Sequence, residues 1–340
     1  MKSFLLYGPQ DVRLTEKDMP VCGPMEVIIQ PRYTGICGSD IHYFKDGYCG
    51  SFRPKYPFAL GHEFSGIVHQ VGAAVQSVTV GDAVAIDPSM PCGTCGFCRE
   101  GQYNLCKNMR FFGSASCDPH QDGSMASYVV APASNCFVLP QGISLSQASL
   151  LEPLSVAMHA VRRAGPIAGK KVLITGGGPI GQLILRVVKA MGAYTITLSD
   201  VSEYARAFAI TSGANWAINP LENGALQQLD QMDIVLEASG NPAALNNGIQ
   251  ALKKGGTLVL VGTLPETFAI NGNAIMSKQL QVLGSFRFAN VFEDAIRMVA
   301  AGIIQLDGMI TNTYLFDEIP QALNYALTQH ERMKIQIVSD

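Results

Sequence analysis

The sequence has no excess of positive charge. Its 340 residues include 24 lysines and arginines against 27 aspartates and glutamates, which gives a formal net charge of −3. Because no basic stripe stands out either, the chain lacks the electrostatic footprint of a nucleic-acid-binding protein. Charged residues make up only 15% of the chain and hydrophobic residues 48%. This composition allows large buried cores and excludes a disordered protein.

Long apolar segments are also missing. No hydrophobic run reaches the roughly 18 residues that a transmembrane helix needs. The N-terminus runs directly into strand-like sequence and lacks the apolar stretch and cleavage site of a signal peptide. We therefore expect a cytoplasmic protein that acts away from membranes.

Nine cysteines are present, an odd number that favours metal binding over a disulfide framework in a chain without a signal peptide. Four of them follow the spacing C-x₂-C-x₂-C-x₇-C, namely Cys92, Cys95, Cys98 and Cys106. Four thiolates at this spacing can close around one tetrahedral ion, which predicts a structural zinc site. An iron–sulfur cluster is the alternative metal centre, and unliganded surface cysteines are the structural alternative.

The pattern of apolar, glycine and proline residues changes near residue 150. Before that point, short β-branched runs alternate with glycine and proline clusters, which predicts an irregular β-barrel or sandwich. From Lys170 to about Gly284 strands and helices alternate, which predicts βαβ units in a doubly wound parallel sheet. We expect one domain at 1–150, completed by about 286–340, and a dinucleotide-binding domain at 151–285.

A glycine-rich turn follows the strand that begins at Lys171. It reads Gly-Gly-Gly-Pro-Ile-Gly from Gly176 to Gly181 and leads into an apolar helix, and Asp200 follows at the end of the next strand. This pattern predicts a Rossmann site in which the glycines admit the pyrophosphate. The carboxylate would bind the adenosine ribose and favour NAD over NADP. The residues predicted to contact the cofactor are Gly176, Gly178, Pro179, Ile180, Gly181, Asp200, Arg206, Val261 and Gly262.

Four other potential metal ligands are scattered along the chain: Cys37, His62, Glu63 and Glu152. Each has an ordinary structural explanation, such as a small core residue, a buried histidine or an acid at a helix start. Their spacing alone does not show that they converge.

The order of these motifs along the whole chain resembles the zinc-containing medium-chain alcohol dehydrogenase family. The resemblance implies a GroES-like catalytic domain and a Rossmann domain, with catalytic zinc held by Cys37, His62 and Glu63. Glu152 stands where other alcohol dehydrogenases have a cysteine ligand, which indicates the polyol branch. It would reach the zinc directly or through water. The family also implies a homo-oligomer, a dimer or a tetramer.

Two segments, Met109–Ala115 and Gly284–Phe288, resemble the L-idonate 5-dehydrogenases within that branch. The resemblance implies that Tyr43 and Arg287 contact substrate and that Ser39 and His42 relay the released proton. A carboxylate substrate would also need a second cation, and the candidates are Lys45, Arg53, Lys55 and Arg110.

The leading hypothesis is therefore a zinc-dependent, NAD-linked oxidation of L-idonate to 5-keto-D-gluconate. A sorbitol-type or xylitol-type polyol dehydrogenase is the alternative within the same chemistry. A non-catalytic relative is the alternative of a different class, and the presence of every expected metal ligand argues against it.

Overall fold

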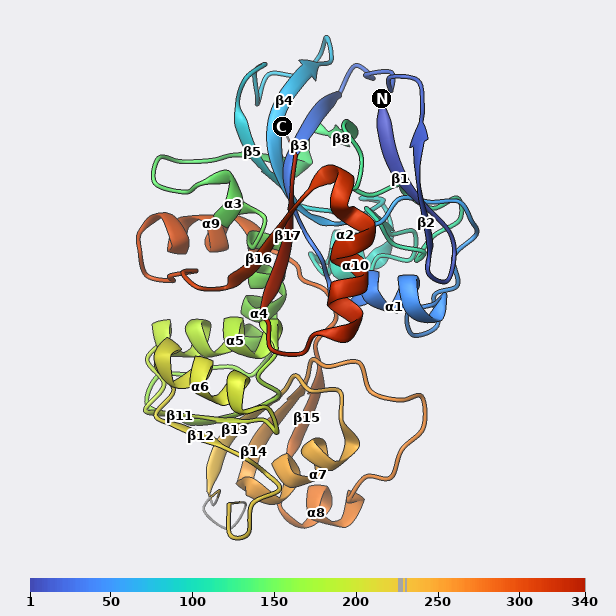
Figure 1. The fold of residues 1–340 in the computed structure, drawn as a ribbon. Coiled ribbons are helices and arrows are strands. Elements are labelled where there is room, and N and C mark those ends of the chain that lie inside the picture. Colours follow the sequence, from blue (N-terminus) through green and yellow to red (C-terminus); the bar gives the residue numbers. More distant parts are fainter. Residues whose placement is uncertain (226–228, 230, 340) are drawn as a thin grey trace. The chain divides into compact units, whose positions relative to one another are not determined.

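A computed structural model describes residues 1–225, 229 and 231–339 of the chain. The chain forms two compact units, whose elements are labelled in Figure 1. The first unit contains Met1–Glu152, Phe292–Ala301 and Leu306–Asp340, and the second contains Pro153–Val291 and Gly302–Gln305. The first is rich in strands and the second is built on a parallel sheet, which confirms the predicted fold class.

The first unit is centred on a seven-stranded sheet in the order β16-β17-β3-β4-β5-β9, with β8 also paired to β3. Its strands are β3 (Glu26–Gly35), β4 (Glu63–Val71), β5 (Ala83–Ile86), β8 (Val129–Pro132), β9 (Cys136–Val138), β16 (Ile310–Leu315) and β17 (Lys334–Val338). Two small sheets accompany it, made of β1 (Lys2–Gly8) with β2 (Asp11–Glu16) and of β6 (Ser89–Met90) with β7 (Arg110–Phe111). The helices of this unit are α1 (Gly38–Asp46), α2 (Gly96–Arg99), α3 (Leu145–Ala148), α9 (Phe292–Ala300) and α10 (Ile319–Thr328), and α4 (Leu151–Arg163) begins in it.

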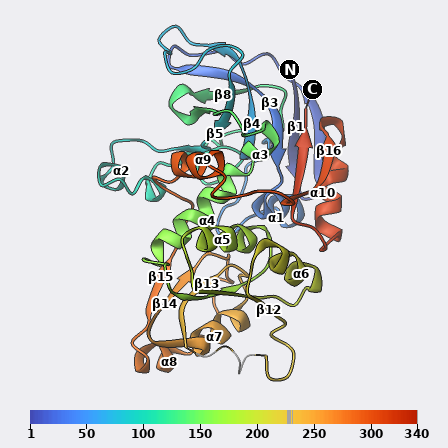
Figure 2. The ribbon, with the colours of Figure 1, turned by 90° about the vertical axis from the view of Figure 1, so that its left-hand side faces the viewer.

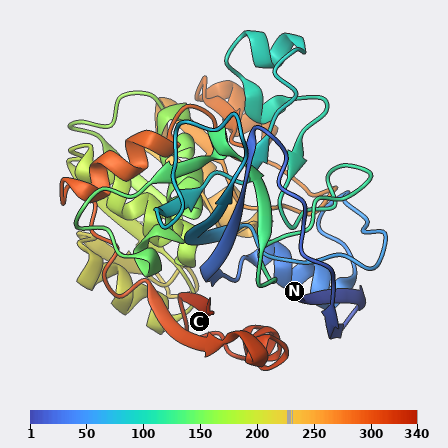
Figure 3. The same cartoon turned by 90° about the horizontal axis from the view of Figure 1, so that it is seen from above.

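The C-terminal segment completes this sheet. Strand β17 runs antiparallel to β3, so that Gln336 lies opposite Gly35. Strand β4 pairs with the other edge of β3, where Glu63 also lies opposite Gly35. In Figure 3 the red C-terminal strand can be followed to the blue strands of the sheet. Gly35 therefore stands between two strands that are far apart in the sequence.

Burial of alternate apolar side chains holds the first unit together. Val27, Ile29, Phe64 and Val68 of β3 and β4 belong to one buried cluster. A second cluster joins the aromatic residues of α1 to Phe58 and to the apolar face of α10. Each fully buried side chain of this size contributes about 1.5–3 kcal/mol relative to exposure, so the two clusters fix the segments that carry the candidate metal ligands.

The second unit is a six-stranded parallel sheet in the order β12-β11-β10-β13-β14-β15. Its strands are β10 (Lys171–Thr175), β11 (Thr195–Ser199), β12 (Trp216–Ile218), β13 (Met232–Glu237), β14 (Leu252–Leu260) and β15 (Gln281–Gly284). Helices α5 (Pro179–Ala190) and α6 (Glu203–Ser212) cover one face, and α7 (Pro242–Ala251) and α8 (Gly272–Ser277) cover the other (Figure 2). This is the doubly wound order, in which ligands bind where the strand order reverses, between β10 and β13.

Local sequence signals set most boundaries of the second unit. Gly178 and Pro179 begin α5, and Ser202 caps α6 by accepting a hydrogen bond from the Ala205 N–H. Strand β14 begins at Leu252, which pairs with Met232, and its register shifts before Thr257 pairs with Ile234. Near the start of this strand, Lys253 forms an ion pair with Asp233 at 2.5 Å. Among the described residues, no helix is both long enough and apolar enough to cross a membrane.

Candidate functional site

Three of the scattered ligands meet in the first unit. The Cys37 sulfur, a ring nitrogen of His62 and a carboxylate oxygen of Glu63 all lie within 4.8 Å of one another. Cys37 precedes α1, His62 precedes β4, and Glu63 is the first residue of β4. The fold thus brings together a thiolate, an imidazole and a carboxylate, which is a ligand set that zinc accepts.

Asp40 joins the two segments that carry these ligands. Its side chain is fully buried and accepts hydrogen bonds from the backbone N–H of Cys37 at 2.9 Å and of Gly61 at 3.2 Å. The same carboxylate lies 3.7 Å from Nδ1 of His62, an atom that has no hydrogen-bond partner among the described residues. A carboxylate behind a histidine ligand orients the ring and increases its basicity, so Asp40 belongs to the site although the sequence did not identify it.

Lys334 is a second residue that the sequence did not reveal. Its ammonium group is buried, donates to Oε1 of Glu63 at 2.5 Å and to the Ile36 carbonyl oxygen at 3.1 Å, and thereby pairs β17 with β4. A side chain at position 35 would come within 2.3 Å of the Glu63 carboxylate. Gly35 therefore leaves the space through which Glu63 crosses β3 to reach Lys334.

Burial of this cluster disfavours the ionised forms of its acidic side chains unless positive charge lies beside them. It raises the pKa of the Cys37 thiol to about 12, with a further contribution from Glu63. Burial also raises the pKa of Glu152 well above its usual value, while His62 lowers it and Glu63 and Cys37 raise it further. Burial alone would lower the pKa of Lys334, but Glu63 and Cys37 outweigh it and raise that pKa. A divalent cation beside Cys37 would stabilise the ionised ligands, and the residues present fit zinc.

The other predicted catalytic residues of the first unit lie around Cys37. Ser39 is in the first turn of α1, two residues after Cys37, and its hydroxyl acts to lower the pKa of the Cys37 thiol. His42 is on the same helix with its side chain 57% exposed, and its Nδ1 lies 3.1 Å from Oδ2 of Asp46. Tyr43 is only 2% exposed, and its hydroxyl accepts a hydrogen bond from the Ala115 N–H at 3.2 Å. This bond ties Tyr43 to the core, and its contact with substrate stays a prediction.

The four cysteines of the C-x₂-C-x₂-C-x₇-C motif converge on one point. The sulfurs of Cys95 and Cys98 are 3.5 Å apart, those of Cys92 and Cys106 are 3.5 Å apart, and those of Cys92 and Cys98 are 4.0 Å apart. Ligands at about 2.3 Å in a tetrahedron are separated by about 3.8 Å, so the sulfurs fit a single zinc ion. They leave no room for the several atoms of an iron–sulfur cluster. A hydrogen bond from the Thr94 backbone lowers the pKa of the Cys92 thiol to about 5, which favours the thiolate.

The glycine-rich turn of the second unit lies where the strand order reverses. Gly176 has a φ of +95°, and a Cβ there would come within 2.6 Å of the Ser239 nitrogen. A Cβ at Gly181 would come within 1.9 Å of the Gly176 carbonyl oxygen. Any side chain at either position would therefore displace the turn. The positions predicted for the dinucleotide, from Gly176 through Gly178, Pro179 and Ile180 to Gly181, form the turn and the start of α5.

Asp200 follows the last residue of β11, and Arg206 lies in the first half of α6. The Asp200 carboxylate accepts hydrogen bonds from the N–H of Gly177 at 2.6 Å and of Ser202 at 2.7 Å. Arg206 donates to the carbonyl oxygens of Asp200 and Val201. Val261 and Gly262 follow β14, and their N–H groups donate to the carbonyl oxygen of Glu237 at 2.8 and 2.9 Å.

Arg287 also lies in the second unit. Its φ is +52°, and its guanidinium group lies 5.0 Å from the centre of the Phe286 ring. Its predicted contact with a substrate carboxylate stays a prediction.

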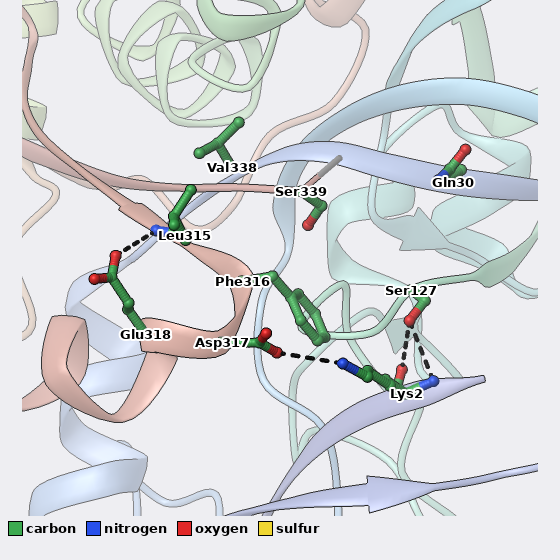
Figure 4. A pocket seen from close by; sticks show the side chains of 9 residues that line it. All are labelled: Lys2, Gln30, Ser127, Leu315, Phe316, Asp317, Glu318, Val338 and Ser339. Carbon is green, nitrogen blue, oxygen red and sulfur yellow. Dashed lines mark hydrogen bonds and ion pairs between the residues drawn. The ribbon is translucent and has the colours of Figure 1, made fainter.

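A cavity of about 280 Å³ lies elsewhere in the first unit, between the N-terminal and C-terminal segments. Figure 4 shows Asp317 paired with Lys2, at 3.7 Å, and Ser127 bonded to the Lys2 backbone. None of its nine lining residues belongs to the predicted site or offers a thiol or an imidazole. We assign this cavity no part in the chemistry.

Comparison with known proteins agrees with this geometry. Residues 23–141 match the alcohol dehydrogenase GroES-like domain, and residues 179–301 match the zinc-binding dehydrogenase family. A probable D-xylulose reductase A of Emericella nidulans is 38% identical over 332 residues, which cover 94% of this chain and 91% of the relative. The crystal structure of Escherichia coli L-idonate 5-dehydrogenase matches with a TM-score of 0.94 at 34% identity, covering 99% of this chain and 97% of that one. Escherichia coli galactitol-1-phosphate dehydrogenase matches with a TM-score of 0.90 at 30% identity, covering 99% and 100%. The chain therefore belongs to the zinc-binding dehydrogenases, oxidoreductases that act on CH–OH groups of polyols and sugars with zinc and a nicotinamide cofactor.

Proposed function

We propose that this enzyme interconverts a neutral polyol and its ketose, as a xylitol-type or sorbitol-type dehydrogenase that uses NAD. The observation that carries this proposal is the 38% identity, over 94% of the chain, to a probable D-xylulose reductase. D-Xylulose is a ketopentose, and reduction of its carbonyl group gives a pentitol. The reverse reaction therefore oxidises a secondary hydroxyl of an uncharged substrate.

The charges around the site support a neutral substrate. A carboxylate substrate requires a cation that has no other partner. Lys55 is paired with Asp118, and Arg110 donates to Oε1 of Gln121 at 2.5 Å. Arg53 stacks on the Tyr48 ring at 3.9 Å and donates to the Gly50 carbonyl oxygen. Three of the four candidates for the second cation, which would accompany Arg287, are thus engaged within the chain.

The residues of the first unit would perform the following steps. Cys37, His62 and Glu63 would hold the zinc, with Asp40 orienting His62 and Glu152 beside the cluster. Zinc held there would supply Lewis-acid activation of a secondary hydroxyl, and the nicotinamide cofactor would supply the hydride acceptor. Ser39 would accept the hydroxyl proton while releasing its own through the cofactor ribose to His42, which is exposed beside Asp46 and would pass a proton to solvent.

The second unit supports NAD as the cofactor. The Asp200 carboxylate lies at the end of β11, where it would accept from ribose hydroxyls and repel a 2′-phosphate. Arg206 is the neighbouring cation, and its Nη1 donates to two backbone carbonyl oxygens, so this atom is not available to a 2′-phosphate. We also propose that the enzyme is a homo-oligomer, either a dimer or a tetramer.

The second candidate is oxidation of a sugar acid such as L-idonate. It is favoured by the TM-score of 0.94 and the 34% identity to Escherichia coli L-idonate 5-dehydrogenase. In this case Arg287 would bind the carboxylate.

The deciding experiment measures kcat/KM with NAD for xylitol, sorbitol, L-idonate and D-gluconate, by NADH absorbance. The neutral-polyol proposal expects the highest value for a polyol and the same order in the Arg287→Ala variant. Activity on L-idonate alone, lost selectively in Arg287→Ala, would overturn it in favour of the sugar acid. A Cys37→Ser variant serves as the matched inactive control.

A further inference from the structure

The second unit contains a buried carboxyl group that neither the metal site nor the phosphate turn uses. Glu237 is the last residue of β13 and is fully buried. In the parallel register it lies beside Thr175, the last residue of β10, and beside Leu260, the last residue of β14. It therefore occupies the carboxyl edge of the sheet where the strand order reverses, which is where a dinucleotide binds.

The two carboxyl oxygens of Glu237 have different environments. Oε1 accepts hydrogen bonds from the Ser239 N–H at 2.8 Å, from the Gly240 N–H at 3.0 Å and from the Ser239 hydroxyl. Because three donors converge on it, Oε1 carries no proton. Oε2 is buried and has no hydrogen-bond partner in the part of the chain that the structure describes. No group there accepts a proton from Oε2, so the contacts fit an ionised carboxylate.

Within the described part of the chain, this negative charge has no cation at ion-pair distance. The ion pairs found among the described residues do not include Glu237, although buried charges are normally paired. On the side of β14, a Cβ at Gly262 would come within 3.0 Å of Oε2 and within 2.3 Å of the Gly240 nitrogen. The charge thus lies directly behind two glycines at the carboxyl edge of the sheet.

The position of Glu237 in the sheet indicates which part of a dinucleotide it faces. Strands β10, β11 and β12 form the half that binds adenosine, and Asp200 follows the last residue of β11. Strands β13, β14 and β15 form the second half, which binds the nicotinamide nucleotide. The nicotinamide ring is positively charged in NAD⁺ and neutral in NADH, so a fixed negative charge in this half acts differently on the two redox forms.

We propose that Glu237 is a positioning residue of the cofactor site whose buried charge favours the oxidised dinucleotide over the reduced one. It holds the turn at Ser239 and Gly240 through Oε1, and its charge stabilises the cationic nicotinamide. This inference rests on the proposed use of NAD and concerns cofactor affinity, so it can be tested without any sugar substrate.

The test compares the dissociation constants of NAD⁺, NADH and ADP-ribose for the zinc-loaded protein and its Glu237→Gln variant, by titration calorimetry. Loss of one charge should weaken NAD⁺ by about tenfold, the order that Coulomb's law gives at an effective protein dielectric near 20 for two charges about 12 Å apart. NADH and ADP-ribose should change much less, because neither carries the cationic ring. Ser239→Ala removes one hydrogen bond but keeps the charge, so it should leave the ratio of the NAD⁺ and NADH constants unchanged.

Equal weakening of NAD⁺ and NADH in Glu237→Gln would overturn the proposal and leave Glu237 as a purely structural residue. Glu237→Met gives a second neutral variant of similar volume, and Glu237→Asp keeps the charge. If both neutral variants lose ADP-ribose binding, the carboxylate serves the fold alone and the proposal is also overturned. Wild-type protein that binds neither NAD⁺ nor NADH would instead refute the proposed use of NAD.

Discussion

The individual residues of the metal site show why its ligands depend on partners that are not ligands. The pKa values of the half-buried Cys37 and the buried Glu152 are raised, and His62 and Glu63 each face a buried charged group. An ion pair of this kind is costly to break, because removing one member leaves the other charge buried and unpaired. The pair of Lys334 with Glu63 should therefore stabilise the first unit as well as the site.

Replacement of Lys334 by methionine tests this pair. The variant keeps the apolar stem but leaves the Glu63 carboxylate unpaired, so we expect the free energy of unfolding to fall by about 3–5 kcal/mol. Urea unfolding would measure it, and adding Glu63→Gln should recover part of the loss. Lys2→Met is the matched control, because Lys2 and Asp317 have side chains 52% and 69% exposed and such pairs contribute only about 0–1 kcal/mol. Equal losses in Lys334→Met and Lys2→Met would contradict the prediction.

Asp87 gives a pH-dependent prediction in the same unit. Burial raises the pKa of Asp87 to about 6, although hydrogen bonds from Ser89 lower it, against an unfolded value of 3.8. The folded state therefore binds this proton more tightly, and the group's contribution to stability is present below about pH 4 and lost as pH rises through about 6. Asp87→Asn should then stabilise the protein near neutral pH, by roughly 1–3 kcal/mol.

Thermal unfolding at a series of pH values checks this prediction. The difference in Tm between Asp87→Asn and wild type should be largest near pH 7.5 and should shrink toward pH 4. Asn135 is not a suitable position for the control variant, because its side-chain amide donates hydrogen bonds to the carbonyl oxygens of Asp87 and Ser89. The exposed Asp18→Asn is the better one, and a constant Tm difference for Asp87→Asn across this range would contradict the assignment.

At the scale of elements, the junction of β10, its turn and α5 depends on close backbone contact. Gly181 lies on the first turn of α5, and the Gly176 carbonyl oxygen occupies the space of its missing Cβ. A single methyl group there would push the helix from the strand and change the direction of the N–H groups that a pyrophosphate binds.

Gly181→Ala should accordingly abolish tight NADH binding and lower stability by about 1–3 kcal/mol, as overpacking does. Fluorescence titration of NADH and urea unfolding would measure the two effects. Gly272→Ala is the matched control, since a Cβ at this first residue of α8 meets nothing within 4 Å. Unchanged NADH affinity in Gly181→Ala would show that the turn does not hold the cofactor.

How much the sequence predicts depends on how local a feature is. The strand, glycine turn and helix lie within one short segment, as do the four cysteines, and both are predicted from spacing alone. The pairing of Glu63 with Lys334 joins residues separated by 271 positions. It depends on β17 lying antiparallel to β3 and on Gly35 leaving a gap, neither of which leaves a local signal. Asp40 does lie three residues after Cys37, but its role appears only when Gly61 and His62 are folded against it.

At the scale of the whole chain, the two units have separate ligands. Both groups of potential metal ligands, around Cys37 and around Cys92, belong to the first unit. The glycine-rich turn, Asp200 and Glu237 belong to the second unit. Each ligand should stabilise the unit that binds it, by an amount that grows with the logarithm of the ligand concentration over its dissociation constant.

Zinc removal should therefore abolish the reaction and destabilise the first unit while the second still binds NADH. The two ligand groups predict about two zinc ions per chain by metal analysis, and Cys98→Ser should reduce this to about one while the Cys37 group keeps its ion. Cys22→Ser is the control, because Cys22 bonds the Glu26 carbonyl oxygen away from both groups. Chelated protein should unfold at a lower midpoint, and the loss of stability should be larger in the first unit than in the second. Its NADH dissociation constant should stay within about twofold of that of the zinc-loaded protein. Loss of NADH binding together with zinc would mean that the second unit depends on the first, and that the chain responds to its two cofactors as one cooperative body.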